Sequence, residues 1–143
     1  RKTMNKGKIS RRQEREQAFI LIFERLFSRD PIREIIDAAE SSEEVQISDF
    51  AEKTASGVEQ HEPELDEKIE KNIRGWKIGR LSKVAFSLLR LAVYEMMYQK
   101  DIPVGVSINE AVDLAKKYGG AEDAPFLNGV LGSIAKELEP GDE

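Results

Sequence analysis

The residues best suited to chemistry are three arginines near the start of the chain. Arg11, Arg12 and Arg15 follow Ser10, which is a suitable N-cap for a helix. On a helical wheel of ~100° per residue the three fall within a wedge of about 100°. Grouped guanidinium side chains are typical of sites that bind phosphate. The chemistry they indicate is recognition of a polyanion.

The charge of the chain is distributed unevenly. The first 15 residues carry seven Arg or Lys side chains and one acid, Glu14, whereas the whole chain has a net charge of −5. A basic arm, residues 1–9, on an acidic body indicates one localised polyanion site, and Lys8 belongs to it. RNA or DNA is the favoured ligand. The alternative is a basic tail that only improves solubility.

The arginine wedge coincides with the apolar face of the same predicted helix, which carries Phe19, Ile22 and Leu26. Burying three guanidinium groups beneath a bundle costs several kcal/mol for each. We therefore expect the first turn to project past the core, with its arginines in water and unpaired with the protein's own acids. Replacing all three arginines by alanine should then weaken RNA binding without lowering the melting temperature.

A second candidate site is the segment 126–129, in which Phe126 and Asn128 lie close together. Unpaired bases stack on aromatic side chains and are recognised by amides. The alternative is an ordinary helix with a core phenylalanine, which the spacing alone favours. Lys116 is a weaker candidate for phosphate contact, because a lysine near a helix C-terminus also has an explanation in the helix dipole.

Catalytic residues are hard to find. The single histidine, His61, falls in a predicted loop, and the absence of cysteine excludes disulfides, thiolate metal sites and a cysteine nucleophile. The sequence contains no nucleophile elbow, phosphate loop or glycine-rich dinucleotide turn. We therefore expect a protein that is not an enzyme and needs neither cofactor nor metal.

Helical periodicity dominates the sequence, and no segment alternates as a strand does. The pattern predicts an all-α fold of about seven helices, in one domain over 10–138 with subdomains of about 10–74 and 75–138 and a loose tail at 139–143. The expected helices begin near Ser10, Pro31, Ser48, Pro63, Leu81, Ser107 and Ala124. A loop is expected at 41–44 and a connector at 75–79.

The helix expected over 81–99 is apolar on nearly all sides, so we expect it at the centre of the fold. Arg90 and Glu95 interrupt it and are interpreted as internal ion-pair or capping residues. Glu110 is expected to bond to a neighbouring helix, and Trp76 to anchor the connector by packing. No apolar run is long enough to span a membrane, and the N-terminus lacks a signal-peptide core, so a cytoplasmic protein is expected.

The order of several motifs resembles the NusB family of bacterial transcription antitermination factors. The resemblance extends from about Ser10 to Leu138. Its motifs are the Arg-Arg-x-x-Arg-Glu start, Leu-Arg-Leu-Ala-Val-Tyr-Glu at 89–95, Pro103, Ile-Asn-Glu-Ala-Val-Asp-Leu-Ala-Lys at 108–116, and Phe-Leu-Asn-Gly-Val-Leu at 126–131. The last two motifs, at this separation, are highly specific together.

This resemblance implies an all-helical fold of two packed three-helix bundles. It also implies binding of the single-stranded boxA element of ribosomal RNA leader transcripts. The partner would be NusE, a small-subunit ribosomal protein, and the complex would join other Nus factors on RNA polymerase to suppress premature termination.

Family roles carry over to individual residues. Arg11, Arg12 and Arg15 match the basic RNA-binding helix start, and Phe126 and Asn128 match the Phe-x-Asn-Gly segment close to that surface. Phe23 matches a position that faces the ribosomal-protein partner. The sequence departs from the family pattern at Ile20, Ala85 and Pro125, which bears on the details of RNA and partner contact.

Two other functions fit the same residues. Similar helical domains serve as accessories in ribosomal RNA cytosine methyltransferases, although the residues after 138 are too few for a methyltransferase domain. The other alternative is a helical scaffold that binds only proteins. The sequence leaves open whether the chain is a monomer or a homodimer.

Overall fold

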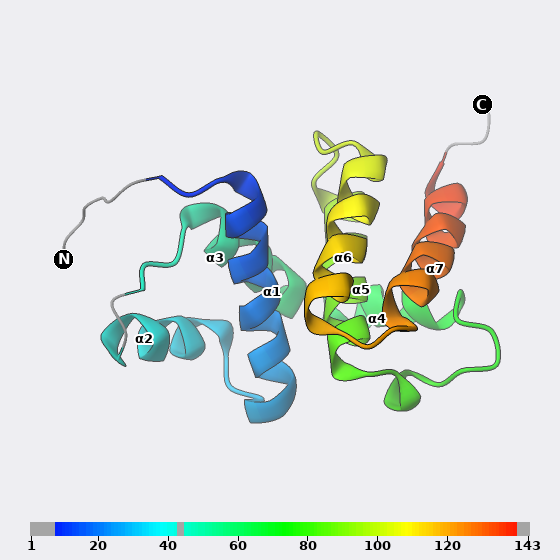
Figure 1. Cartoon of the computed structure of the whole chain (residues 1–143). Coiled ribbons are helices and arrows are strands. Elements are labelled where there is room, and N and C mark those ends of the chain that lie inside the picture. The colour runs from blue at the N-terminus through cyan, green and yellow to red at the C-terminus, as the bar shows by residue number, and fades with distance from the viewer. Residues whose placement is uncertain (1–7, 43–44, 140–143) are drawn as a thin grey trace.

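The computed structural model describes residues 8–42 and 45–139, and within these the chain is helical without strands (Figure 1). The expected arm and tail lie mostly outside the described residues. The helices are α1 (Arg11–Ser28), α2 (Ile32–Ser42), α3 (Asp49–Gln60), α4 (Glu62–Glu70), the short 3₁₀ helix η1 (Ile78–Arg80), α5 (Lys83–Tyr98), α6 (Val104–Tyr118) and α7 (Asp123–Leu138).

The helices form two bundles of three. Helices α1, α2 and α3 all contact one another, and so do α5, α6 and α7. Figure 1 shows the two groups side by side, with α4 behind the second. Helix α5 joins them, because it also packs against α1, α3 and α4. The all-α fold of two three-helix bundles is therefore confirmed.

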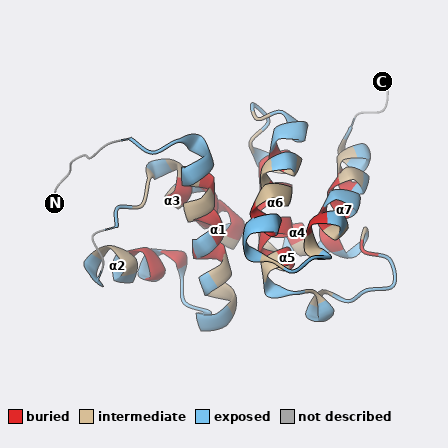
Figure 2. Ribbon diagram, viewed as in Figure 1, coloured by how far each residue is buried: buried red, intermediate tan, exposed pale blue. Residues whose placement is uncertain are grey.

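Helix α5 occupies the centre, as its sequence predicts. Eleven of its 16 residues are buried, and Figure 2 shows buried residues concentrated where the helices face one another. The buried apolar side chains of all seven α-helices form one hydrophobic cluster. The two bundles therefore share a core.

Local signals explain the helix boundaries. The backbone N–H of Gln13 donates a hydrogen bond to Ser10 Oγ at 3.1 Å, and the backbone N–H of Ser10 donates one to Gln13 Oε1 at 2.8 Å, which makes a capping box. Ser48 and Ser82 cap α3 and α5 in the same way. Helix α1 ends at Ser28 and is followed by the C-cap residue Arg29, whose φ of 64° is left-handed.

Three local expectations need correction. Helix α6 begins at Val104, directly after Pro103, instead of near Ser107, because proline is well suited to a helix start. Helix α2 continues through Ser42 into the expected loop, where the Ser42 hydroxyl donates to the Ala38 carbonyl at 2.8 Å. Trp76 packs only partly, since 57% of it is exposed.

Arg90 takes part in internal ion pairing, as expected. Its Nε and Nη2 donate to the two oxygens of Asp66 at 2.9 and 2.8 Å, and Glu62 lies 3.3 Å from Nη1. Because Asp66 and Glu62 belong to α4, this cluster fixes α4 against α5.

Within the described residues, no helix has the length and apolarity needed to cross a membrane.

Candidate nucleic-acid interface

Arg15 lies beneath the bundle instead of in water. Its side chain is 4% exposed, and its Nε donates to Glu95 Oε2 at 2.7 Å. Glu95 comes from α5 and is itself 1% exposed, while the Ser107 hydroxyl donates to its other oxygen at 2.6 Å. The buried pair therefore connects α1, α5 and α6.

This geometry overturns the expectation that the three arginines remain unpaired. The helical wheel correctly predicted that Arg15 lies on the apolar face of α1. The free-energy cost of burying it was expected to be prohibitive because no carboxylate partner was foreseen. Glu95, expected separately to serve in an internal pair, supplies the countercharge and removes much of that cost. Alanine at Arg15 would strand a buried carboxylate, so the expectation of an unchanged melting temperature is also withdrawn.

Arg12 is exposed but paired with α6. Its side chain is 61% exposed, and Nη2 lies 2.9 Å from both Glu110 Oε2 and Asp113 Oδ2. The hydrogen bond that Arg12 donates to Glu110, followed by the one that it donates to Asp113, raises the pKa of the Arg12 guanidinium. Glu110 is therefore bonded to a neighbouring helix as expected, and Arg12 reaches solvent with its charge already compensated.

Arg11 is held more loosely. Its Nε lies 3.0 Å from Glu14 Oε1 on the same helix, and its guanidinium carbon sits 4.0 Å from the centroid of the Phe50 ring. More than half of the side chain, 57%, faces solvent. A phosphate could therefore reach Arg11 without disturbing the core.

The two candidate lysines are exposed and have no salt bridge within the described part of the chain. Lys8 precedes α1, and Lys116 lies in the last turn of α6. The neighbour of Lys116 behaves differently, since Lys117 Nζ lies 2.7 Å from Glu16 Oε2. The hydrogen bond from Lys117, with a further one from Tyr118, lowers the pKa of Glu16.

Phe126 and Asn128 lie in the first turns of α7. Phe126 is half-buried and meets the Trp76 ring edge-on, with 6.1 Å between ring centroids, whereas Asn128 is exposed. The start of α7 and the start of α1 lie on different sides of the molecule (Figure 1). The structure therefore does not bring these two residues together with the arginines in one compact site.

A shallow groove accompanies Phe126. It has a volume of about 390 Å³ and lies between the connector and α7, with Trp76, Arg74 and Pro125 among its lining residues. The charge pattern of the sequence also points to this surface. The segment 71–83 contains five Lys or Arg residues and no acid.

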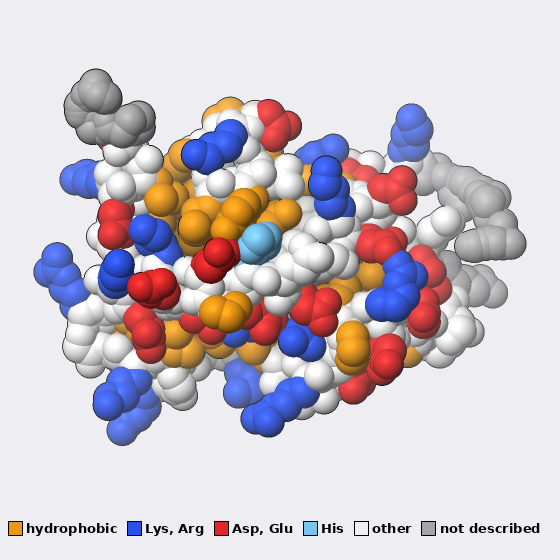
Figure 3. All heavy atoms as spheres, turned by 180° about the vertical axis from the view of Figure 1, so that it is seen from behind, with side chains coloured by type: hydrophobic (Ala, Val, Ile, Leu, Met, Phe, Trp, Pro, Cys, Tyr) orange, Lys and Arg blue, Asp and Glu red, His pale blue; other side chains and the backbone are white. Residues whose placement is uncertain are grey.

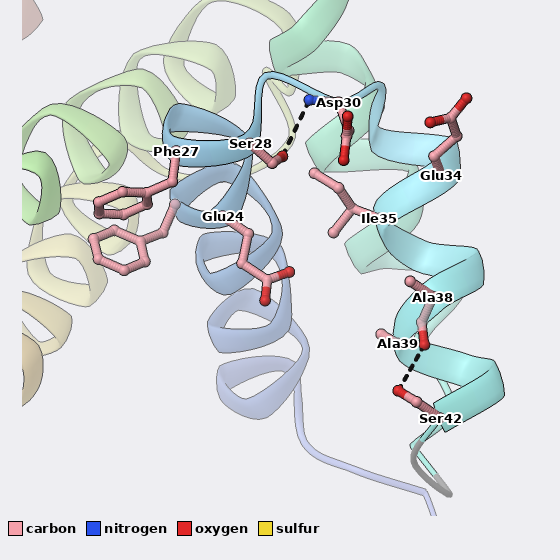
Figure 4. A pocket seen from close by; sticks show the side chains of 10 residues that line it. Glu24, Phe27, Ser28, Asp30, Glu34, Ile35, Ala38, Ala39 and Ser42 are labelled. Carbon is pink, nitrogen blue, oxygen red and sulfur yellow. Dashed lines mark hydrogen bonds between the residues drawn. The ribbon is translucent and has the colours of Figure 1, made fainter.

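Phe23, the candidate partner residue, is half-buried in α1. Its ring packs against Phe19 and Phe27, with centroids 5.6 and 5.0 Å apart. It lines a groove of about 540 Å³ between α1 and α2. Figure 4 shows Glu24 and Ile35 on the two sides of this groove, with the Phe27 ring directed away from α2.

The departures from the family pattern occupy different environments. Ile20 is 40% exposed on α1, and Pro125 lines the groove beside Phe126. Ala85 is 1% exposed, so its side chain is not available to a partner in this structure.

His61 is engaged in the structure at the junction of α3 and α4. Its ring stacks on Tyr98 with a centroid distance of 4.2 Å, and Nδ1 lies 2.7 Å from Glu64 Oε1. The Tyr98 hydroxyl donates to the same carboxylate oxygen at 2.6 Å and, more than His61, lowers the pKa of Glu64. Figure 3 shows this histidine beside a group of apolar side chains.

The described residues contain no cluster of acids and histidines arranged to hold a metal.

The fold and this surface define an all-helical protein of two three-helix bundles, with an arginine-rich helix start clamped to a central helix. A model of the NusB family matches residues 12–136. The chain belongs to the NusB family.

Curated relatives match over nearly their whole length. The transcription antitermination protein NusB of Clostridium botulinum (strain Kyoto / Type A2) is 41% identical over 143 residues, covering 88% of this chain and 99% of that protein. The protein of the same name from Bacillus subtilis (strain 168) is 40% identical over 131 residues, covering 92% and 98%.

Solved structures of the family are similar as well. The structure of T. maritima NusB superposes with a TM-score of 0.80 and 34% identity, covering 92% of this chain and 94% of that one. A crystal structure of the antitermination factors NusB and NusE in complex with dsRNA contains a chain with a TM-score of 0.79 and 29% identity, covering 89% and 96%.

Proposed function

We propose that this protein is a transcription antitermination factor that binds the single-stranded boxA element of ribosomal RNA leader transcripts together with NusE. The observation that carries the proposal is the match to antitermination proteins over nearly the whole of both chains. The similar chain in the complex of NusB and NusE with dsRNA supports NusE and RNA as the partners. Other Nus factors and RNA polymerase would join indirectly, and the protein would act without catalysis or cofactor.

The residues divide into two roles. Lys8, Arg11 and Arg12 expose their charges and would contact phosphates, with Lys116 as a further contact. Arg15 is buried against Glu95, so we assign it to holding the helix start against α5 and α6. Phe126 and Asn128 would contact bases, and Phe23 would face NusE.

The proposal predicts a moderate dependence on salt. If about three to five phosphates are neutralised, log affinity falls against log salt with a slope of roughly −2 to −4 for single strands. Arg12 is paired with Glu110 and Asp113, so a phosphate must compete with two carboxylates for it. We therefore expect the shallower slope, near about −2.

The test is a titration of labelled boxA RNA and of a scrambled RNA of equal composition, each with and without NusE. We expect boxA to bind more tightly, with the difference larger when NusE is present. Arg11→Ala should weaken binding with only a small loss of stability, and Lys53→Ala, at an exposed lysine of α3, is the charge-matched control. Equal binding of boxA and scrambled RNA in the presence of NusE would contradict the proposal.

The two alternatives are less well supported. The curated relatives are matched over 98–99% of their own length, so the similarity is to whole antitermination proteins and not to one domain of a larger enzyme. A scaffold that binds only proteins would show NusE binding without any contribution from RNA, which the same titration detects.

A further inference from the structure

The connector, defined by the structure as residues 71–83, runs from the end of α4 to the first residue of α5 and is the second strongly basic segment of the chain. Over 71–83 it carries Lys71, Arg74, Lys77, Arg80 and Lys83 and no acidic residue. All five side chains are exposed. The rest of the protein is acidic overall, so this segment is a local positive surface.

These cations differ from the arginines of α1 in one respect that matters for ligand binding. Each of Arg11, Arg12 and Arg15 has a carboxylate of the protein within 4 Å. Among the described residues, none of the five connector cations has such a partner, although Lys83 lies 5.5 Å from the Phe27 ring. A phosphate approaching the connector therefore has no internal salt bridge to displace.

The connector also offers an aromatic surface. Trp76 is 57% exposed and meets Phe126 edge-on, with an interplanar angle of 64°. The groove of about 390 Å³ beside them also exposes polar groups, because Asn72 and Ser133 line it and the Ser133 hydroxyl donates to Asn72 Oδ1 at 2.6 Å. Arg74 also lines the groove.

We propose that the connector is a second RNA-binding surface, in which an unpaired base stacks on Trp76 in the groove while the flanking phosphates contact Arg74 and Lys77. The proposal rests on the proposed RNA-binding function and extends it from Phe126, already assigned to base contact, to Trp76 and the cations beside it. An accessible aromatic ring beside unpaired cations is the arrangement by which single strands are held. A duplex would offer no free base to the ring.

The position of the connector gives this surface a distinct role. In Figure 1 it loops out on the side of the second bundle away from α1, passes the start of α7 and then runs back along that bundle toward the end of α1. A strand held there and at the first turn of α1 would contact both bundles. Arg80 and Lys83 continue the positive charge from the groove toward Phe27.

Trp76 provides the readout, because it is the only tryptophan in the chain. The probe is a single-stranded RNA of about 12 nucleotides, within the range of single-strand site sizes. We expect saturable quenching of Trp76 fluorescence by the RNA and little quenching by inorganic polyphosphate, which carries charge without bases. Equal quenching by both polyanions would overturn base stacking and leave a surface for acidic ligands in general.

Variants test the contacts separately. We expect Trp76→Ala to weaken RNA binding about fivefold to tenfold, near the lower end of base–aromatic stacking, and Trp76→Phe to retain most of the affinity. Arg74→Gln with Lys77→Gln should make the salt slope shallower by about 1.4, for two phosphates. The matched control is Lys53→Gln with Lys100→Gln, which removes the same charge from exposed lysines elsewhere.

The outcomes separate this inference from the proposed function. If RNA binds the wild type but binds the Trp76 and Arg74/Lys77 variants equally well, the second surface is ruled out and the function stands. If the control pair weakens binding as much as Arg74/Lys77, only net charge matters and the inference also fails. If the wild type binds no RNA, with or without NusE, the proposed function itself is contradicted.

Discussion

The pair between Arg15 and Glu95 shows how one contact can determine which residues are available to a ligand. Both side chains are at most 4% exposed, and Ser107 satisfies the second carboxylate oxygen. A buried ion pair adds little net stability compared with apolar residues, but loss of one partner leaves an uncompensated charge. The pair therefore matters most for holding α1 in one position.

Replacing Arg15 by alanine should lower the free energy of unfolding by about 3–5 kcal/mol, because Glu95 would remain buried and unpaired. The double variant Arg15→Met with Glu95→Leu should recover most of that loss. Urea unfolding followed by circular dichroism measures both. Arg11→Ala, which breaks an exposed pair, should cost less than about 1 kcal/mol. If Arg15→Ala also lowered the free energy of unfolding by less than about 1 kcal/mol, the buried-pair interpretation would be contradicted.

Asp113 should restrain RNA binding, since it shares Arg12 with Glu110. Asp113→Asn removes one competing carboxylate, and we expect RNA affinity to rise about twofold to fivefold, the value of an exposed ion pair. Fluorescence anisotropy with labelled RNA measures the change. Combining it with Arg12→Ala should abolish the gain. A gain that persists without Arg12 would point to a general charge effect.

At the scale of elements, the close approach of α3 to α5 depends on a glycine. A methyl group at Gly57 would overlap the Tyr94 ring, whereas one at Gly132 in α7 would meet open space. We expect Gly57→Ala to destabilise by about 1–3 kcal/mol through overpacking. Gly132→Ala should stabilise by up to about 1 kcal/mol through helix propensity. Thermal unfolding of the two variants compares them, and a stabilising Gly57→Ala would show that the contact is looser than described.

The contact between α1 and α6 at Glu16 should make stability sensitive to acid. Hydrogen bonds from Lys117 and Tyr118 lower the pKa of Glu16 below its usual 4.5. The stability it contributes is present above the unfolded-state pKa and is lost as pH falls through the folded-state pKa. Glu16→Gln should therefore lose less unfolding free energy between about pH 5 and about pH 3 than the wild type. Glu34→Gln, at an exposed position of α2, is the control and should follow the wild type.

At the scale of the whole molecule, the two bundles share one hydrophobic cluster, so they should unfold together. Leu21→Ala in α1 should cost about 2–5 kcal/mol. It should move the unfolding midpoint equally by circular dichroism and by fluorescence of Trp76, which lies beside α7. A fluorescence midpoint that stays in place while the helical signal becomes biphasic would show that the bundles unfold independently.

Much of the fold could be predicted because the relevant interactions are local. The serines at 10, 48 and 82 act as helix caps within three residues of their partners. The central position of α5 follows from its apolar residues on all sides. Two helix boundaries differ from the prediction, the start of α6 and the end of α2. They lie where proline and serine permit more than one boundary.

The candidate site could be predicted only in part. The residue types at the start of α1 were identified correctly, but their state of pairing was not, because Glu95 and Glu110 lie 80 and 98 residues from their arginine partners. The connector cations were visible in the sequence, yet only the structure shows that none of them has a carboxylate partner among the described residues.

The amino-acid sequence by itself determined the helical class, the order of the helices and the presence of two basic segments, because periodicity, capping and composition act over a few residues. Only the tertiary structure decided which of those charges face carboxylates and which face water. Ion pairing depends on neighbours brought together by folding, and no local pattern specifies them.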